Sequence, residues 1–342
     1  MHLLVFRFSS LGDIAMTVPV FRALFQQNES LRLTLVIPPW ASPLFHEFER
    51  MEIVPIDTKG AHHNAKGLMD LFRILQEKGP YSAVVDLHVV LRSVFLTLLF
   101  QLRANRVVRL KKGRLEKKRL IRTKNKTLRP LVHTVFRYAS CFQKLGLSVR
   151  MPALLPMKPP LPAQIRDWGP LHQKWIGIAP FAAHIGKMYP LDKMQQVVAY
   201  LCQKHTVMLF SAPGHERQQC AIWAKAYPHT FVVGESMSFE EELQILAHLD
   251  LMISMDSANA HLSANWEIPT LTVWGQTHPY AGFAPFGQPL ENCLLPDYNR
   301  FPELPISIFG NKGGVEMRPI FETITAKQII EKALEIIGQT SS

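Results

Sequence analysis

Short apolar segments alternate with amphipathic segments along almost the whole of this chain, and this alternation constrains its fold more than any other feature. The pattern is typical of βα units that build parallel sheets. The apolar segments contain few polar residues, as expected of strands whose sheet is covered by helices on both faces. We predict strands at residues 3–8, 33–37, 53–56, 83–87, 106–108, 175–179, 206–210, 230–233, 251–254 and 270–273. We predict helices at residues 13–26, 66–77, 92–102, 131–145, 191–204, 215–226, 239–248, 259–265 and 325–337.

A run of prolines divides this alternation into two halves. Its members are Pro152, Pro156, Pro159, Pro160, Pro162 and Pro170. Because proline fixes φ and lacks a backbone N–H, the stretch cannot continue a helix or a central strand, and we interpret it as an interdomain connector. The length of 342 residues also favours two domains of ordinary size. We therefore expect two doubly wound α/β domains with parallel sheets, at residues 1–155 and 156–325, facing each other across a cleft.

A clearly amphipathic segment lies in the last part of the chain, residues 326–342. We predict a helix there that is capped by Thr325 and stopped by Gly338. One interpretation is that this helix packs back toward the N-terminal domain.

Composition excludes several classes of protein. Hydrophobic residues make up 47% of the chain and charged residues 19%, which excludes both a disordered acidic chain and a polytopic membrane protein. The apolar run at residues 94–100 is far below the ~20 residues needed to span a bilayer. The first eight residues look like a core strand and not like a secretion signal. The four cysteines are too far apart for a zinc knuckle or a redox motif, so we expect reduced thiols in a cytoplasmic protein.

The positive charge is confined to the first half of the chain. Residues 1–150 hold 25 Lys and Arg against 10 Asp and Glu, whereas the remainder holds 13 against 17. Within this half, residues 103–129 contain 13 basic residues and a single acid, Glu116. Such density indicates a polyanionic partner, which could be nucleic acid, anionic lipid headgroups or a phosphorylated substrate, or else a solvated loop with no dedicated partner. No aromatic residue interrupts the run, so stacking on bases is unsupported.

Ligands of open parallel sheets bind beyond the carboxyl ends of the strands, and the loop after the first predicted strand carries Ser10, Gly12 and Asp13. Gly12 allows close approach of a ligand or of another backbone, and the following helix start favours an anion. The loop is neither a GxGxxG fingerprint nor a P-loop. Asp13 has two interpretations: a routine helix cap, or a carboxylate that accepts a proton from an incoming hydroxyl.

Lys187 follows the first predicted strand of the second half and is the one fixed cation of its loop. A compact ammonium group at this place can neutralise a phosphate oxygen, although a plain surface lysine is equally compatible with the sequence. His184, in the same loop, has the weaker claim, because a loop histidine is more often a solvated side chain.

Two further loops rich in polar and small residues follow the strands predicted at 251–254 and 270–273. In the first of these loops, Asp256 or Ser257 would cap a helix whose first amides point at an anionic ligand. His261, one helical turn further on, can donate to a phosphate oxygen. Asp256 suits sugar hydroxyls better than phosphate, because neighbouring anions repel each other. The second loop, at residues 274–279, is expected to return to the same place, and we interpret the two loops as a binding site.

In their order and spacing these residues resemble glycosyltransferase family 9, the lipopolysaccharide heptosyltransferases. The resemblance covers nearly the whole chain. It rests on residues 7–14 and 86–93, on Lys187 with Tyr189 and Pro190, on Asp256, Ser257 and His261, and on residues 268–270, 274–277 and 285–287.

This resemblance implies a GT-B architecture of two Rossmann-like domains, with the acceptor bound mainly by the first and the nucleotide sugar by the second. It implies inverting transfer of a heptose from an ADP-heptose donor to the inner core of a lipid A precursor. It also implies that no cofactor and no metal-chelating Asp-x-Asp motif are needed. The protein would then be peripheral at the inner face of the inner membrane, with residues 103–129 attracted to the anionic membrane surface and its phosphorylated lipids, and with no nucleic acid partner.

The resemblance also assigns roles to single residues. Asp13 would be the general base, and Lys187 would hold the pyrophosphate and offset the charge of the leaving group. Asp256 would hold hydroxyls of the donor sugar. The remaining donor-side residues would be Ser257, Ala258, His261, Gly275 and Thr277, and the acceptor-side residues would be Ser10, Gly12, His88 and Arg92.

The chain departs from the family's usual pattern at four positions. Ala258 stands where glycine is common, Ala182 and Ala183 where hydroxyl residues are common, and Tyr189 where tryptophan is usual. These departures leave a different nucleotide or sugar open. A nucleotide-sugar epimerase with two Rossmann-like domains is an alternative enzyme, and a nucleic-acid-binding protein would explain the charge but not the loops at Lys187 and Asp256. The sequence leaves the oligomeric state open.

Overall fold

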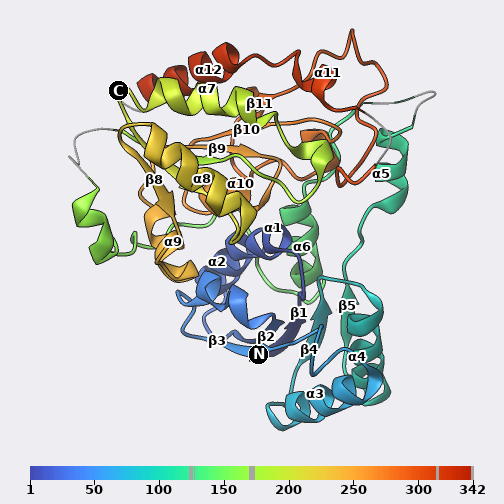
Figure 1. Cartoon of the computed structure of the whole chain (residues 1–342). Coiled ribbons are helices and arrows are strands. Elements are labelled where there is room, and N and C mark those ends of the chain that lie inside the picture. The colour runs from blue at the N-terminus through green and yellow to red at the C-terminus, as the bar shows by residue number, and fades with distance from the viewer. Residues whose placement is uncertain (123–125, 127, 169–173, 313–315, 340–342) are drawn as a thin grey trace. The chain divides into compact units, whose positions relative to one another are not determined.

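The computed structural model describes residues 1–122, 126, 128–168, 174–312 and 316–339, and it divides into two compact units. The first unit comprises Met1–Lys112 and Thr134–Pro156, and the second comprises Gly113–His133 and Met157–Ser342 (Figure 1). We expected the division after residue 155, and the structure has it after Pro156. Residues 113–133, however, belong to the second unit, whereas we expected them in the N-terminal domain.

The first unit is built on a sheet of five parallel strands in the order β3-β2-β1-β4-β5. The strand β1 lies between β2 and β4, with Leu4 in register with Thr34 on one side and Val84 on the other. The strands are β1 (His2–Phe6), β2 (Arg32–Ile37), β3 (Met51–Pro55), β4 (Ala83–Asp86) and β5 (Val107–Arg109).

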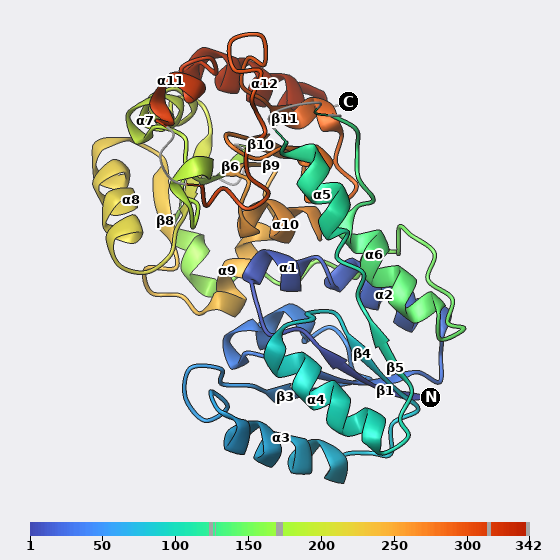
Figure 2. The same ribbon diagram turned by 90° about the vertical axis from the view of Figure 1, so that its right-hand side faces the viewer.

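Helices cover both faces of this sheet (Figure 2). On one face, buried side chains of α3 and α4 pack on Leu4 and Phe6 of β1. On the other face, Phe21 of α2 lies 5.9 Å from Phe45 and 6.0 Å from Phe142 of α6, measured between ring centroids. The helices are α1 (Leu11–Ala15), α2 (Val18–Gln27), α3 (Ala65–Glu77), α4 (Leu91–Leu102), α6 (Thr134–Gln143) and the 3₁₀ helix η1 (Pro39–Phe45).

The second unit repeats this plan with six parallel strands in the order β11-β10-β9-β6-β7-β8. When β6 to β11 are numbered 1 to 6 along the chain and the sheet is read from β8, the order is 3-2-1-4-5-6. This is the strand order of a Rossmann-type doubly wound sheet. The strands are β6 (Trp175–Ala179), β7 (Thr206–Phe210), β8 (Thr230–Val233), β9 (Leu251–Met255), β10 (Thr270–Val273) and β11 (Cys293–Leu294).

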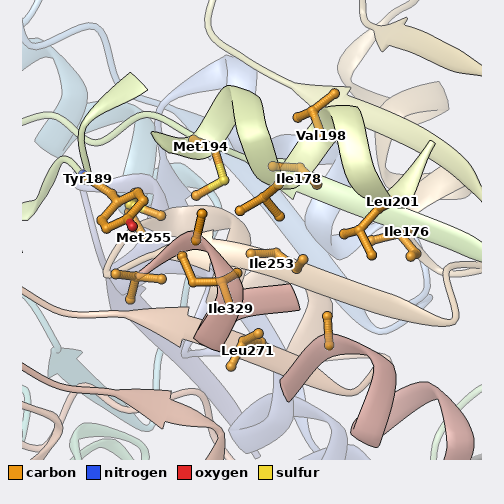
Figure 3. Packing of buried hydrophobic residues seen from close by; sticks show 14 of the residues in the cluster. Ile176, Ile178, Tyr189, Met194, Val198, Leu201, Ile253, Met255, Leu271 and Ile329 are labelled. Atoms are coloured by element: carbon orange, nitrogen blue, oxygen red, sulfur yellow. The ribbon is translucent and has the colours of Figure 1, made fainter. Parts of the chain in front are cut away.

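The largest apolar core of the described chain lies in the second unit (Figure 3). Ile178 and Ile253 of the sheet pack there with Met194 of α7 and Ile329 of α12, while α9 and α10 lie against each other, with α10 on β9 and β10. The helices are α5 (Arg114–Leu120), α7 (Leu191–Leu201), α8 (His215–Ala226), α9 (Phe239–Leu246), α10 (Ala258–Ala264), α11 (Arg318–Phe321) and α12 (Ala326–Gln339). The 3₁₀ helices are η2 (Ala163–Asp167), η3 (Ile185–Lys187), η4 (Pro279–Ala281) and η5 (Leu290–Asn292).

The terminal helix α12 ends later than predicted. The Thr325 hydroxyl accepts a hydrogen bond from the Gln328 N–H at 3.1 Å, as a cap does, but the helix continues through Gly338 to Gln339. Its apolar face is buried against α7 and β9 in the core of the second unit. Packing of this helix toward the N-terminal domain stays a prediction.

Other differences concern the ends and interruptions of elements. The segment predicted as one helix at 13–26 forms two helices, because α1 ends at its C-cap Met16 and α2 begins at Val18. Pro19 lies in the first turn of α2, where a missing N–H costs nothing. The helices α5 and α11 and the two-residue strand β11 were not predicted. The prolines from 152 to 162 lie outside helices and strands, and Pro170 lies outside the described residues. No helix in the described part of the chain is long and apolar enough to span a bilayer.

Candidate active site

In the first unit the polar loops meet because of the strand order. The strands β1 and β4 are neighbours, and the chain continues from them to opposite sides of the sheet, toward β2 and toward β5. Ligands of doubly wound sheets bind at such a switch point, beyond the carboxyl ends of the strands. The residues Ser10, Gly12 and Asp13 follow β1, while His88 and Arg92 follow β4. All five predicted acceptor-side and base residues therefore belong to one edge of one sheet.

Asp13 lies in the first turn of α1, and its side chain is 29% exposed. Its Oδ2 lies 2.7 Å from Nη2 of Arg7 and accepts a hydrogen bond from the Ser10 hydroxyl at 3.1 Å. The N-cap residue of α1 is Ser10, whose side chain makes no capping bond. The carboxylate of Asp13 is thus held in an ion pair at the sheet edge, and the alternative interpretation of Asp13 as the helix cap does not describe it.

Arg7 is a site residue that the sequence reasoning missed. It is buried, and its Nη1 donates to the Leu87 carbonyl at 2.7 Å, so it connects the loop after β1 with the loop after β4. Its guanidinium carbon lies 5.7 Å from the ring centroid of Tyr138. Burial raises the pKa of the Tyr138 hydroxyl, which therefore stays neutral beside Asp13. The available signal was a lone cation in an otherwise apolar segment, since a buried charge needs a partner.

His88 fixes the conformation of the loop after β1. Its Nδ1 accepts from the Phe8 N–H at 3.4 Å, which leaves Nε2 to donate to the Ser9 hydroxyl at 3.3 Å. Burial, with the nearby cations Arg7 and Lys112, lowers the pKa of His88 to about 3. The imidazole is accordingly neutral around pH 7, and both ring nitrogens are engaged with the backbone and side chain of this loop.

Asp86 has a comparable role in the loop after β4. Its carboxylate accepts hydrogen bonds from the N–H groups of His88 at 2.9 Å and Val89 at 2.7 Å and from the Ser93 hydroxyl at 2.9 Å. These bonds hold Val89 at a φ of 50°, in the left-handed region that β-branched residues rarely adopt. Burial raises the pKa of Asp86, and the three donors act against that rise. Next along the chain, Arg92 keeps its buried Nε without a hydrogen-bond partner among the described residues.

In the second unit the switch point lies between β6 and β9. Lys187 follows β6, Asp256 follows β9, and Thr277 follows β10. The Lys187 ammonium lies 2.8 Å from Oδ2 of Asp256, and the Thr277 hydroxyl donates to the same oxygen at 2.7 Å. The side chain of Asp256 is only 6% exposed. Three residues predicted from three separate loops thus meet at one carboxylate oxygen.

The pairing of Lys187 with Asp256 was not expected, because the two residues were assigned to different parts of the donor. An ammonium group has three N–H donors, so a lysine that gives one to Asp256 keeps two for other oxygens. The salt bridge therefore fixes the position of the cation without using up its capacity to bind an anion.

The loop that carries Lys187 and the loop that follows β10 are in close contact. A Cβ atom on Gly275 would lie 2.5 Å from the Gly186 carbonyl oxygen, so only glycine fits there. The next residue, Gln276, donates its N–H to that same carbonyl at 2.8 Å. Gln276 is fully buried, and its side-chain Oε1 has no hydrogen-bond partner in the part of the chain that the structure describes. Gly275 therefore serves the packing of the Lys187 loop, and sequence reasoning overlooked Gln276.

The start of α10 holds the remaining donor-side residues. Ser257 is the N-cap residue, and its hydroxyl lies 3.0 Å from that of Ser254. Ala258 begins the helix, and His261 is buried within it. Tyr189, the departure from the usual tryptophan, is a core residue whose hydroxyl donates to the Ile324 carbonyl at 2.7 Å.

The basic segment is divided between the two units. Residues 103–112 belong to the first unit, where Arg109 donates to the Thr97 hydroxyl at 2.8 Å. Residues 113–129 belong to the second unit, where α5 packs its Leu120 inward and places Lys117 4.0 Å from the ring centroid of Phe283. Thr123, Lys124, Asn125 and Thr127 lie outside the described residues. The described part of the basic segment is therefore shared between the two units.

Solved structures of similar fold cover essentially the whole chain. A glycosyl transferase family 9 protein from Veillonella parvula shares 16% identity at a TM-score of 0.75, covering 99% of this chain and 97% of that one. The E. coli ADP-heptose lps heptosyltransferase II shares 15% at 0.68, covering 100% of both chains. The E. coli heptosyltransferase WaaC with ADP-2-deoxy-2-fluoro heptose shares 18% at 0.67, covering 98% and 99%. The fold is that of a GT-B glycosyltransferase.

Sequence comparison gives the family. The model of glycosyltransferase family 9 (heptosyltransferase) matches residues 69–309, which is more than half of the chain. The chain belongs to glycosyltransferase family 9. No curated protein matches its sequence.

Proposed function

We propose that this glycosyltransferase moves a heptose, with inversion, from an ADP-heptose donor to the lipid A–inner core acceptor of lipopolysaccharide. Family membership supports heptosyl transfer, and the similar E. coli structures are of an ADP-heptose lps heptosyltransferase and of WaaC with a fluorinated ADP-heptose. The observation that carries the proposal is the convergence of Lys187, Asp256 and Thr277 at one buried carboxylate oxygen beyond the switch point of the second sheet.

On the donor side, the ammonium of Lys187 supplies the positive charge that a diphosphate needs. As the anomeric carbon–oxygen bond breaks, negative charge grows on the leaving ADP, and a fixed cation stabilises that charge. Asp256 keeps the cation in place and offers its carboxylate to hydroxyls of the sugar. Ser257, Ala258 and His261 line the phosphate pocket in this proposal. No three His, Cys, Asp or Glu side chains of the described residues are grouped as metal ligands, so in this proposal neutralisation of the diphosphate falls to Lys187.

On the acceptor side, Asp13 is the general base. It takes the proton of the acceptor hydroxyl while the acceptor oxygen forms a bond to the anomeric carbon and ADP leaves from the opposite face of the sugar. Arg7 and Ser10 orient the carboxylate through the contacts at 2.7 and 3.1 Å. Arg92, whose buried Nε has no partner in the described chain, supplies a cation for the phosphorylated acceptor. Gly12 and His88 shape the loop in which the acceptor binds.

We further propose a cytoplasmic protein that is peripheral at the inner face of the inner membrane. The exposed cations of α5, Arg114, Lys118 and Arg119, would be attracted to anionic headgroups, each by about 1 kcal/mol. We expect no nucleic acid partner, because the two switch-point loops would then have no role. Association with anionic vesicles should accordingly weaken as salt is raised.

A thermal-shift screen over nucleoside diphosphates and their sugars tests the donor. A ligand that binds only the folded state raises the Tm by mass action, and we expect ADP and ADP-heptose to raise it more than UDP, GDP or their sugars. Lys187→Ala should remove the shift, whereas Lys327→Ala, at an exposed position of α12, should leave it intact. A shift with UDP-sugars alone, followed by their interconversion without an acceptor, would replace the transferase by an epimerase.

A further inference from the structure

Helix α4 (Leu91–Leu102) has three of its leucines on the outside. Leu91 is 91% exposed, Leu98 is 49% exposed and Leu102 is 84% exposed. At 3.6 residues per turn these three positions point within about 40° of one another, so they form a single stripe along the helix. Single exposed leucines are normal on protein surfaces, but a contiguous apolar stripe marks an interaction site.

The inner face of α4 packs Leu96 and Phe100 into the core of the first unit and also carries two polar residues. Ser93 and Thr97 are buried. The Ser93 hydroxyl donates to Asp86 at 2.9 Å, and the Thr97 hydroxyl accepts from Arg109 at 2.8 Å. These inward side chains already fix the helix to the first unit, and none of them belongs to the outer stripe. The core of the first unit therefore does not account for the outer leucines.

The surroundings of this stripe are basic. Residues 87–112 contain six Arg and Lys and no Asp or Glu. Three of the six, Arg103, Arg106 and Lys111, are exposed. The neighbouring helix α3 lies beside α4 (Figure 2) and carries the exposed Ile74 and two acids, Asp70 and Glu77. Asp70 is already paired with Arg73 at 2.8 Å, so the surface as a whole remains positive.

We propose that the outer face of α4 is a membrane-docking surface, which inserts Leu91, Leu98 and Leu102 among the acyl chains of a bilayer containing anionic phospholipid. An interfacial helix binds through buried apolar area together with the attraction of basic residues to anionic lipids, and α4 offers both. A second copy of this chain fits less well, because two such faces would bring their cations together.

The location agrees with the proposed acceptor, and this one step rests on the proposed function. The stripe begins at Leu91, three residues after His88 and directly before Arg92. A lipid-linked acceptor in the bilayer would thus be presented to the edge of the sheet that carries Asp13. The docking surface itself is defined without any sugar chemistry.

Vesicle sedimentation of the full-length protein tests the proposal. The vesicles contain three parts phosphatidylethanolamine and one part phosphatidylglycerol, with pure phosphatidylcholine for comparison, at about 0.1 M and about 1 M salt. The test variant is Leu91→Ser/Leu98→Ser/Leu102→Ser. The matched control is Ile222→Ser/Leu290→Ser/Leu334→Ser, which removes three exposed apolar side chains from the second unit. Thermal melts verify that each variant is folded.

We expect the wild type to bind the anionic vesicles, with a fraction that persists at high salt. The α4 variant should bind at least tenfold more weakly at low salt and not at all at high salt, because only the electrostatic part remains. The control should bind like the wild type. A third variant, Arg103→Gln/Arg106→Gln/Lys111→Gln, should lose binding at low salt but keep the salt-resistant fraction.

Equal vesicle binding by the wild type and the α4 variant would overturn the proposal. So would a change confined to self-association, measured by sedimentation velocity without vesicles, since α4 would then be an interface between copies. Brominated acyl chains should quench the added fluorescence of Leu98→Trp, and the absence of quenching would also count against insertion. Failure of the proposed function would be a separate result, in which the protein transfers heptose to no acceptor while its binding to vesicles is unchanged.

Discussion

The switch points of the two sheets hold the same kind of pair in different surroundings. In the first unit Asp13 is paired with Arg7 at 2.7 Å, and in the second Asp256 is paired with Lys187 at 2.8 Å. The carboxylate of Asp13 is 29% exposed, whereas that of Asp256 is 6% exposed. The partly exposed Asp13 can take a proton from an incoming acceptor hydroxyl, whereas the buried Asp256 holds its cation and, in the proposed function, accepts hydrogen bonds from the donor sugar. The comparison shows that accessibility, and not the presence of an ion pair, separates a candidate base from a candidate anchor.

The cations differ as well. Arg7 is buried, and its planar guanidinium bridges Asp13 and the Leu87 carbonyl, which fixes the geometry of the first pair. Lys187 is a compact charge on a flexible stem that can turn its other N–H groups toward a ligand. The first pair is built to orient a carboxylate, and the second is built to present a cation.

The largest effect is expected at Asp13. Asp13→Asn keeps the shape of the side chain but cannot take a proton, so kcat for heptosyl transfer should fall by about a thousandfold. The affinity for ADP-heptose, measured by calorimetry, should change by less than about threefold. Asp70→Asn, an exposed acid on α3, serves as the control and should be fully active.

Unchanged turnover in Asp13→Asn would remove this residue from the mechanism and make the two pairs equivalent. A loss of donor affinity that matched the loss of kcat would instead move Asp13 to the donor site.

The next effect is expected at Lys187. Lys187→Met leaves the buried Asp256 without its cation, which should lower the free energy of unfolding by about 3 kcal/mol and abolish the ADP-induced thermal shift. The double variant Lys187→Met/Asp256→Asn should recover most of the stability, because the uncompensated charge is gone, but not the shift. Arg7→Met should cost no more than about 1 kcal/mol, since Asp13 remains in contact with water. Urea unfolding compares all three, and equal costs for Lys187→Met and Arg7→Met would contradict the proposed difference in burial.

Two partly buried titratable groups, one in each unit, give opposite pH dependences. Because the pKa of His88 is lowered to about 3 from its ordinary value of 6.5, the unfolded chain takes up that proton first, and stability should fall as pH drops from about 6.5 toward 3. Burial raises the pKa of Glu242 to about 7 from 4.5, despite the nearby Arg217, so stability should fall as pH rises from about 4.5 to 7. Each slope is at most about 1.4 kcal/mol per pH unit.

Urea unfolding across this range, with His88→Gln and Glu242→Gln, separates the two contributions. Each substitution should flatten only its own window. A His88→Gln variant with the same acid limb as the wild type would show that the imidazole is not held neutral by the fold.

The smallest effect is expected at Ser10. Ser10→Ala removes one hydrogen bond to the partly exposed carboxylate of Asp13, which Arg7 still holds, so the free energy of unfolding should change by about 0.5 kcal/mol. The value of kcat should fall by less than about tenfold, with KM for the acceptor rising more than KM for the donor. A larger loss than that of Asp13→Asn would give the hydroxyl a catalytic role of its own.

Much of the fold could be predicted from the sequence. The strands at 175–179, 206–210, 230–233 and 270–273 match the structure residue for residue, because a buried parallel strand is a short and largely apolar run. The prediction of one continuous helix at 13–26 was wrong, because a new helix begins with Pro19 in its first turn. The assignment of residues 113–133 to the second unit could not be found, because no local pattern records which core a surface segment joins.

For the candidate site, the sequence determined which residues follow the strands, since that depends only on neighbours along the chain. Asp13, Lys187, Asp256 and Thr277 were found in this way. The tertiary structure alone decided that Lys187 and Thr277 share an oxygen of Asp256 and that Arg7 holds Asp13. It also decided that three of the five leucines of α4 face outward. These facts depend on strand order and on packing between distant segments, and contacts between residues far apart in sequence leave no periodicity in a single chain.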